Sequence, residues 1–196
     1  MAVRDAPTCS CAVEDRRIPA FLLDNLLRRL FQPPRRFVAR YVRAGDRVAD
    51  LGCGPGHFTV PMSKAVREGG RVFAVDFDPD AIGKVRRKIA RLGLGHVVDA
   101  RVASAAEIDF VEAGSLDFVL AEGLLCCMQD HAGALEQIRR ILRPKGKAWL
   151  SVMKFGRPDD PRTVTASEWT SILNTMRVLE SGESLLSRWA LVSPSP

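Results

Sequence analysis

Residues Val48–Thr59 read VADLGCGPGHFT, an apolar stretch that runs into three alternate glycines, Gly52, Gly54 and Gly56. Glycine has no Cβ, so it takes positive φ values and lets a ligand approach the main chain closely. A loop of this kind after a strand directs helix N-terminal amides at a polar ligand group. The segment therefore predicts a strand, a tight turn and a helix that together hold a nucleoside-type ligand.

A second strand is expected at Arg71–Asp76 (RVFAVD), where an apolar run ends in a carboxylate. Asp76 lies about 20 residues beyond Gly56, the interval typical of a βαβ unit whose acid binds a ribose. A nicotinamide dinucleotide site usually reads G-x-G-x-x-G and holds a pyrophosphate. Here the glycines read G-x-G-x-G, and Asp50 would repel a pyrophosphate but suits the ammonium of an amino acid. S-adenosylmethionine carries that ammonium and a ribose, and it has no phosphate.

Together these motifs resemble the class I S-adenosylmethionine-dependent methyltransferases, in the small-molecule branch of methyltransferase types 11 and 25. Leu116–Leu120 (LDFVL) resembles the fourth strand of that family, and Ile141–Val152 (ILRPKGKAWLSV) resembles its fifth strand with the preceding Pro-x-Gly turn. The resemblance extends from Pro33 to Ser193. It implies an α/β fold, a doubly wound Rossmann-like three-layer sandwich with a seven-stranded, mostly parallel sheet and an antiparallel C-terminal hairpin.

The resemblance also implies a cofactor site for S-adenosylmethionine, with S-adenosylhomocysteine as the product. The methionine end would contact Asp50 and the glycine loop, Asp76 would bind the ribose, and Phe77 would pack on the adenine. Ser104 stands where many relatives have an acid that contacts the adenine amine, which puts that contact in doubt. The cofactor-binding residues expected on this basis are Asp50, Gly52, Cys53, Gly54, Gly56, Asp76, Phe77, Ser104, Ala105 and Ala121.

Substrate chemistry is expected at Ala121–Asp130 (AEGLLCCMQD), which follows the fourth strand and faces the methyl group in this family. Glu122 is the acid expected closest to that group. His131 has a side chain that titrates near neutrality and is a candidate base, although we favour a solvated position for it at a helix start. Cys126 is the third catalytic candidate. The nucleophile of the acceptor stays open among oxygen, nitrogen, carbon and sulfur, and no resident metal is expected.

Three other functions are weighed against methylation of a small molecule. The adjacent thiols of Cys126 and Cys127 suit a soft acceptor, which would make the protein a thiol or metalloid methyltransferase. A cofactor-binding or regulatory subunit without turnover would keep the same motifs. A nicotinamide-dependent reductase is disfavoured by the glycine spacing and Asp50.

The net charge of +6 raises the question of a nucleic-acid partner. The basic residues are scattered over predicted amphipathic helices as short clusters such as Arg86-Arg87-Lys88 and Arg139-Arg140, which are typical of solvated faces. Base-binding methyltransferases carry an N-P-P-Y type sequence after the fourth strand, and this chain has none. We therefore expect a small-molecule substrate and neither nucleic acid nor a membrane as partner.

The chain has 196 residues, of which 46% are hydrophobic, and this suits one compact domain. We expect a flexible N-terminus at 1–17, a single domain at 18–193 whose residues 18–44 form a helical lid, and a tail at 194–196. Five cysteines without zinc-like spacing indicate reduced thiols. A cytoplasmic monomer or homodimer is the expected form.

The hydrophobic periodicity predicts alternating strands and helices, as in a parallel α/β sheet. Strands are expected at 47–51, 71–76, 97–102 and 116–120, in the stretch that ends at 152, and at 177–183 and 187–192, and helices at 18–31, from Pro34, at 56–67, 78–92, 130–142 and 165–176.

Overall fold

The computed structural model describes residues 34–157 and 159–194. Its elements in chain order are α3 (Pro34–Tyr41), β1 (Arg47–Leu51), α4 (Thr59–Val66), β2 (Arg71–Asp76), α5 (Pro79–Arg91), β3 (Val98–Val102), β4 (Leu116–Glu122), the 3-10 turn η1 (Leu125–Cys127), α6 (His131–Ile141), β5 (Leu142–Met153), α7 (Ala166–Asn174), β6 (Arg177–Glu183) and β7 (Ser187–Ser193). The described strands form one seven-stranded sheet in the order β3-β2-β1-β4-β5-β7-β6. β1 to β5 are parallel, whereas β7 is antiparallel to β5 and to β6. The predicted fold class is confirmed.

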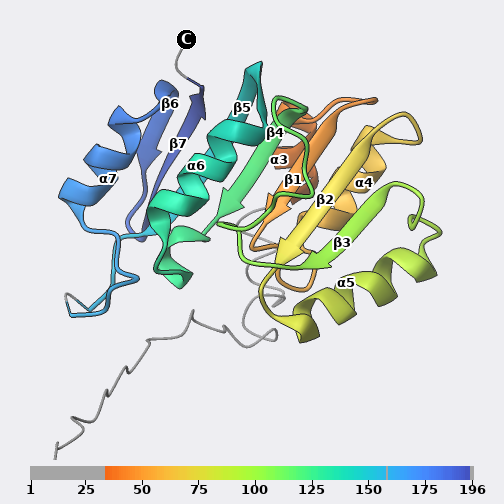
Figure 1. The fold of residues 1–196 in the computed structure, drawn as a ribbon, viewed down its shortest axis with the longest axis horizontal. Coiled ribbons are helices and arrows are strands. Elements are labelled where there is room, and N and C mark those ends of the chain that lie inside the picture. The colour runs from red at the N-terminus through yellow and green to blue at the C-terminus, as the bar shows by residue number, and fades with distance from the viewer. Residues whose placement is uncertain (1–33, 158, 195–196) are drawn as a thin grey trace, which may run out of the picture.

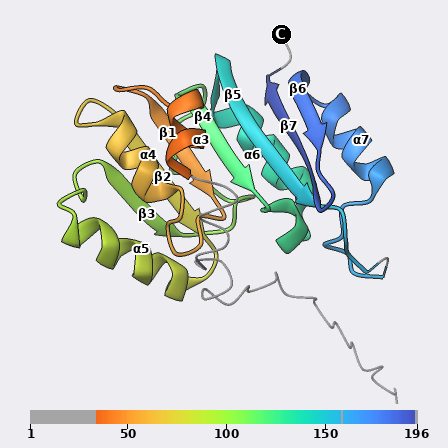
Figure 2. The same cartoon turned by 180° about the vertical axis from the view of Figure 1, so that it is seen from behind.

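Helices cover both faces of the sheet, which gives three layers. In Figure 1 α6 lies in front of the sheet, and the reverse view in Figure 2 brings α3 and α4 forward. Alternate residues of the central strands β1 and β4 pack into two separate cores: Ala49 and Val119 pack with α6 and α7, whereas Val48 and Phe118 pack with α3, α4 and α5. Strands buried on both faces account for the nearly continuous apolar runs that the sequence shows.

Two glycines, Gly56 and Gly146, determine where α4 begins and how closely β5 approaches β4. The helix expected from Gly56 begins three residues later, at Thr59, because Gly56 has a φ of 86° and cannot be helical. Within β5, where its pairing with β4 shifts register after Leu142, a Cβ on Gly146 would come within 2.7 Å of the Leu116 carbonyl oxygen. Glycine is therefore required there for β5 to approach β4.

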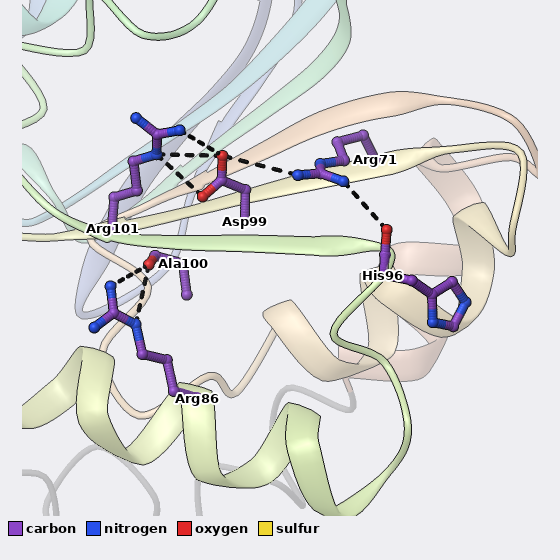
Figure 3. A network of polar contacts seen from close by, with 6 residues as sticks. All are labelled: Arg71, Arg86, His96, Asp99, Ala100 and Arg101. Carbon is purple, nitrogen blue, oxygen red and sulfur yellow. Dashed lines mark hydrogen bonds and ion pairs between the residues drawn. The ribbon is translucent and has the colours of Figure 1, made fainter.

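The outer strand β3 is held by a network of arginines (Figure 3). Arg86 of α5 donates two hydrogen bonds to the Ala100 carbonyl oxygen, at 3.2 and 2.8 Å. Arg71 donates to the His96 carbonyl oxygen, and Arg101 pairs with Asp99. The expectation that Arg86 belongs to a purely solvated face is wrong, since its guanidinium joins α5 to β3.

A second such arginine is Arg140 of α6. It donates to the carbonyl oxygens of Ile108 and Val111, at 3.0 and 2.9 Å, and so joins α6 to the segment before β4. The solvated role expected for this residue is therefore also wrong, because its charge satisfies buried main-chain acceptors.

The predicted helix at 18–31, the flexible segment 1–17 and most of the lid and of the tail lie outside the described residues. Within 34–44 the structure shows α3, where Phe37 packs edge-on against Phe58 with ring centroids 5.4 Å apart. None of the helices described at 34–157 and 159–194 is long and apolar enough to cross a membrane.

Candidate active site

Three carboxylates stand at the carboxyl edge of the parallel sheet, on its α3–α4–α5 face. Asp50, Asp76 and Glu122 occupy the ends of β1, β2 and β4. Side chains alternate along a strand, so each of these acids shares its face with Val48, Ala74 or Leu120, which belong to the core under α3, α4 and α5. Ligands of open α/β sheets bind at this edge.

Asp50 and Asp76 are both buried, at 3% and 8% exposure. Asp50 accepts a hydrogen bond from the Thr59 hydroxyl at 2.6 Å. Asp76 accepts from the Gly54 N–H at 2.8 Å and from the Asp78 N–H at 2.9 Å, one bond to each carboxylate oxygen. Burial raises the pKa of Asp76 above its ordinary value, and the two N–H donors lower it in part. Each acid keeps acceptor capacity for a ligand, since a carboxylate oxygen has two lone-pair sites.

The glycine loop connects these two acids. Gly52, Gly54 and Gly56 have φ values of 71°, 51° and 86°, in the left-handed region that side chains disfavour. The N–H groups of Gly52 and Cys53 both donate to the Val75 carbonyl oxygen, at 2.8 and 3.0 Å. The loop is therefore bonded to the end of β2, which places Asp76 beneath it.

A cavity of about 950 Å³, its open mouth included, lies under the loop. The lining residues that matter here are the acids Asp50, Asp76, Asp78 and Glu122 and the apolar side chains Phe58, Phe77, Leu124 and Met128. Among the described residues of its wall there are four carboxylates and no lysine or arginine. Such a wall suits a cationic ligand and opposes a pyrophosphate.

Glu122 enters the cavity from the end of β4 and is held by β5. Its Oε2 accepts a hydrogen bond from the indole Nε1 of Trp149 at 2.9 Å. The next residue, Gly123, donates its N–H to the Ser151 hydroxyl at 2.9 Å. Two alternate residues of β5 therefore fix the end of β4 and the acid that it carries.

Comparison with known proteins identifies the family. Residues 49–150, slightly more than half of the chain, match the family described as "Methyltransferase domain". The chain belongs to the class I S-adenosylmethionine-dependent methyltransferases. This match covers β1 through β5 up to Leu150, the part of the methyltransferase fold that carries Asp50, Asp76 and Glu122.

Similar proteins include a ubiquinone biosynthesis O-methyltransferase from Xanthomonas axonopodis, 36% identical over 59% of this chain and 46% of the relative. A demethylmenaquinone methyltransferase from Lactobacillus johnsonii is 28% identical over 61% of this chain and 48% of the relative. The match thus spans about half the length of these relatives. The crystal structure of a SAM-dependent methyltransferase from Aquifex aeolicus has a TM-score of 0.76 at 21% identity, covering 90% of this chain and 97% of that one, and supports the fold.

The residues present fit the cofactor of this methyltransferase family. The two buried acids suit an ammonium and a ribose, and the described wall around them has no lysine or arginine. A Cβ on Gly52 would come within 3.0 Å of Leu124 Cδ1, so a larger residue here would press on the Leu124 side chain, which also lines the cavity. Burial, together with Asp50 and Asp76, raises the pKa of the Cys53 thiol well above its usual range, so the thiol adds no charge.

The structure brings most of the predicted cofactor residues together. Eight of the ten line the cavity, namely Asp50, Gly52, Cys53, Gly54, Asp76, Phe77, Ser104 and Ala105. Gly56 and Ala121 stand outside this part of the described wall: Gly56 packs toward Val85, and Ala121 is fully buried in the sheet. Their expected contact with the cofactor stays a prediction.

His131 does not take the solvated position expected for it. The ring is 7% exposed, with Nδ1 2.6 Å from Glu168 Oε1 and Nε2 2.9 Å from the Met128 carbonyl oxygen. Both ring nitrogens thus face acceptors, and His131 lies outside the described cavity wall. It joins α7 to the segment after β4, and its candidate role as a base stays a prediction.

Of the two adjacent thiols, Cys127 lines the cavity and Cys126 does not. The Cys126 thiol donates to the Gly123 carbonyl oxygen at 3.1 Å. The candidate role of Cys126 in catalysis is therefore not supported by its position. No group of three or more potential metal ligands occurs among residues 34–157 and 159–194.

Trp149 and Phe58 are the site residues that the sequence did not indicate. Phe58 lines the cavity directly after the glycine loop, and Trp149 bonds to Glu122 from a strand 27 residues farther along the chain. The position of Trp149 in β5 was predictable, but its partner depends on the register between β4 and β5.

Proposed function

We propose that this protein transfers a methyl group from S-adenosylmethionine to a small hydroxylated acceptor, with Glu122 as the group that receives the hydroxyl proton. The observation that carries the proposal is the cavity wall, whose charged side chains are all carboxylates in a protein of net charge +6. When bound, S-adenosylmethionine supplies an electrophilic methyl group on a sulfonium that is already a good leaving group.

In this proposal each residue of the cavity has a role that follows from its position. Asp50 holds the ammonium of the cofactor, and Asp76 accepts from the ribose hydroxyls. The loop at Gly52–Gly56 brings main-chain groups within reach, and burial excludes water. Alignment of this kind contributes about 7–11 kcal/mol to barrier reduction in favourable cases.

Glu122 lines the same cavity as Leu124 and Met128, which supply an apolar wall, and we assign the acceptor to this part of the cavity. A hydroxyl oxygen becomes a stronger nucleophile as its proton passes to a carboxylate. In the net step the oxygen–carbon bond forms, the sulfur–carbon bond breaks, and the proton moves to Glu122. The names of the Xanthomonas axonopodis and Lactobacillus johnsonii relatives support a quinone-type acceptor, and the first of them, an O-methyltransferase, supports an acceptor oxygen.

The test is an assay of S-adenosylhomocysteine formation with a panel of catechols, simple phenols, amines and thiols as acceptors. The expected result is turnover that requires a catechol or phenol. Glu122→Gln should lower kcat by about 10²–10⁴-fold, the range of general base catalysis. Tight binding of the cofactor with no turnover for any acceptor would contradict the proposal and favour a non-catalytic subunit.

A further inference from the structure

We propose that Trp149 is a positioning residue for Glu122: its indole N–H fixes the orientation of the carboxylate that lines the cavity. The effect of Trp149 on turnover rests on the proposed function of Glu122. The hydrogen bond between the two side chains is a feature of the structure and does not depend on that function. Nothing in the family match or in the relatives assigns a role to this tryptophan.

The contact joins two neighbouring strands at the edge where the cavity opens. Trp149 pairs with Leu120, and Ser151 pairs with Glu122, so the tryptophan lies two residues back from the acid on the same sheet face. The Nε1–Oε2 distance is 2.9 Å. An indole N–H is only a donor, so it stabilises a charged carboxylate more than a protonated one.

The indole is itself fixed from two sides. Trp189 of β7 stacks on it with ring centroids 4.5 Å apart and an interplanar angle of 12°. Phe37 of α3 meets it edge-on at 5.0 Å and 82°. A Cβ on Gly182 of β6 would come within 2.7 Å of the Trp189 ring, so this glycine leaves the room in which Trp189 lies. The C-terminal hairpin and α3 therefore both support the orientation of the acid.

Packing alone does not require an indole at this position. A phenylalanine would keep a flat ring between Trp189 and Phe37, but it would leave Oε2 of Glu122 without this donor. The hydrogen bond is thus the property that separates a positioning role from a structural one, and Trp149→Phe isolates it.

The first experiment needs no acceptor. The full-length chain contains three tryptophans, so a ¹⁵N-labelled sample gives three indole N–H resonances, and Trp149→Phe identifies the one of interest. We expect the Trp149 resonance to shift with pH in the wild type and to lose that shift in Glu122→Gln, with Trp169 in α7 as the internal control.

Other titrating groups line the same cavity, so the decisive quantity is the difference between the wild type and Glu122→Gln. These groups are Asp50, Cys53, His57, Asp76, Asp78 and Cys127. A Trp149 shift that persists unchanged in Glu122→Gln would overturn the proposal, whether or not the protein turns out to methylate anything.

The second experiment measures turnover. Trp149→Phe should lower kcat about tenfold and alter the acidic limb of the pH–rate profile, because the lost donor contacts the carboxylate that is proposed to receive the proton. S-adenosylmethionine affinity should stay unchanged. Trp189→Phe is the matched control, since it alters the stacking but keeps the Trp149 N–H. If both variants lose kcat equally and neither changes the pH–rate profile, Trp149 has only a packing role and the proposal is wrong. Absence of turnover in the wild type would refute the proposed function, while the resonance experiment still decides the contact.

Discussion

Replacing Asp76 with Asn keeps the shape of the side chain and removes one of its two acceptor oxygens. In the native protein the two oxygens accept from the N–H groups of Gly54 and Asp78 at 2.8 and 2.9 Å. The amide has one oxygen and one NH₂ group, so one backbone N–H meets a donor. Such a mismatch costs about 1–3 kcal/mol. Because burial already disfavours the charge on Asp76, the neutral amide offsets part of that cost, and we expect a loss of stability near 1 kcal/mol.

The effect on cofactor binding is larger than the effect on stability. The carboxylate is proposed to accept from the ribose hydroxyls, and a hydrogen bond to a charged group contributes about 1.5–3 kcal/mol. Loss of one such bond lowers affinity by about 10- to 100-fold. A ribose hydroxyl that meets the NH₂ group adds to this loss. We therefore expect Asp76→Asn to lower the affinity for S-adenosylmethionine by close to 100-fold, the upper end of this range.

Isothermal titration calorimetry with S-adenosylmethionine measures this effect, and circular dichroism shows whether the variant is folded. Asp99→Asn is the matched control, because the same change is made on the neighbouring strand β3, where Asp99 pairs with Arg101 outside the described cavity wall. The control should bind as the wild type does. A folded Asp76→Asn variant whose affinity stays within about twofold of the wild type would refute the ribose assignment.

Three further predictions concern the loop, the buried histidine and acidification. Gly56→Ala places a Cβ within 3.2 Å of Val85 Cγ2 at a positive φ, so urea denaturation should show a loss of about 1–3 kcal/mol, and an unchanged midpoint would contradict the strain. Glu168→Ala removes the acceptor of the buried His131 Nδ1 and should lower the stability by about 1 kcal/mol without a change in cofactor affinity; weakened binding would place His131 in the site after all. Since burial raises the pKa of Asp76, this carboxylate takes up a proton at a higher pH than an exposed aspartate, and S-adenosylmethionine affinity measured calorimetrically should fall on mild acidification. The profile of Asp76→Asn should be flatter, and equal pH dependence in both proteins would assign the effect to another group.

Features that depend on a few neighbouring residues were predictable from the sequence. The strands at Arg47–Leu51 and Arg71–Asp76 have the expected bounds. Asp78 and Asp130 cap the helices that follow them, accepting from the N–H groups of Asp80 and Gly133. Such caps need only a short polar side chain near free N–H groups, and that requirement is visible in the local sequence.

Contacts between distant segments were not predictable. The Trp149–Glu122 bond depends on the register of two strands, and the His131–Glu168 pair joins residues 37 positions apart. A histidine beside a helix start has the same local sequence whether it is solvated or buried, and only the packing of α7 decides between them. Single-sequence patterns give the positions of the acids at the sheet edge, but not the partners that orient them.

Side-by-side calorimetric titration of the full-length protein with S-adenosylmethionine, S-adenosylhomocysteine and NADH tests the central claim most directly. The carboxylate-lined cavity predicts dissociation constants on the order of micromolar for the first two ligands and no measurable binding of NADH, whose pyrophosphate the acids repel. Binding of NADH without binding of S-adenosylmethionine would contradict the account.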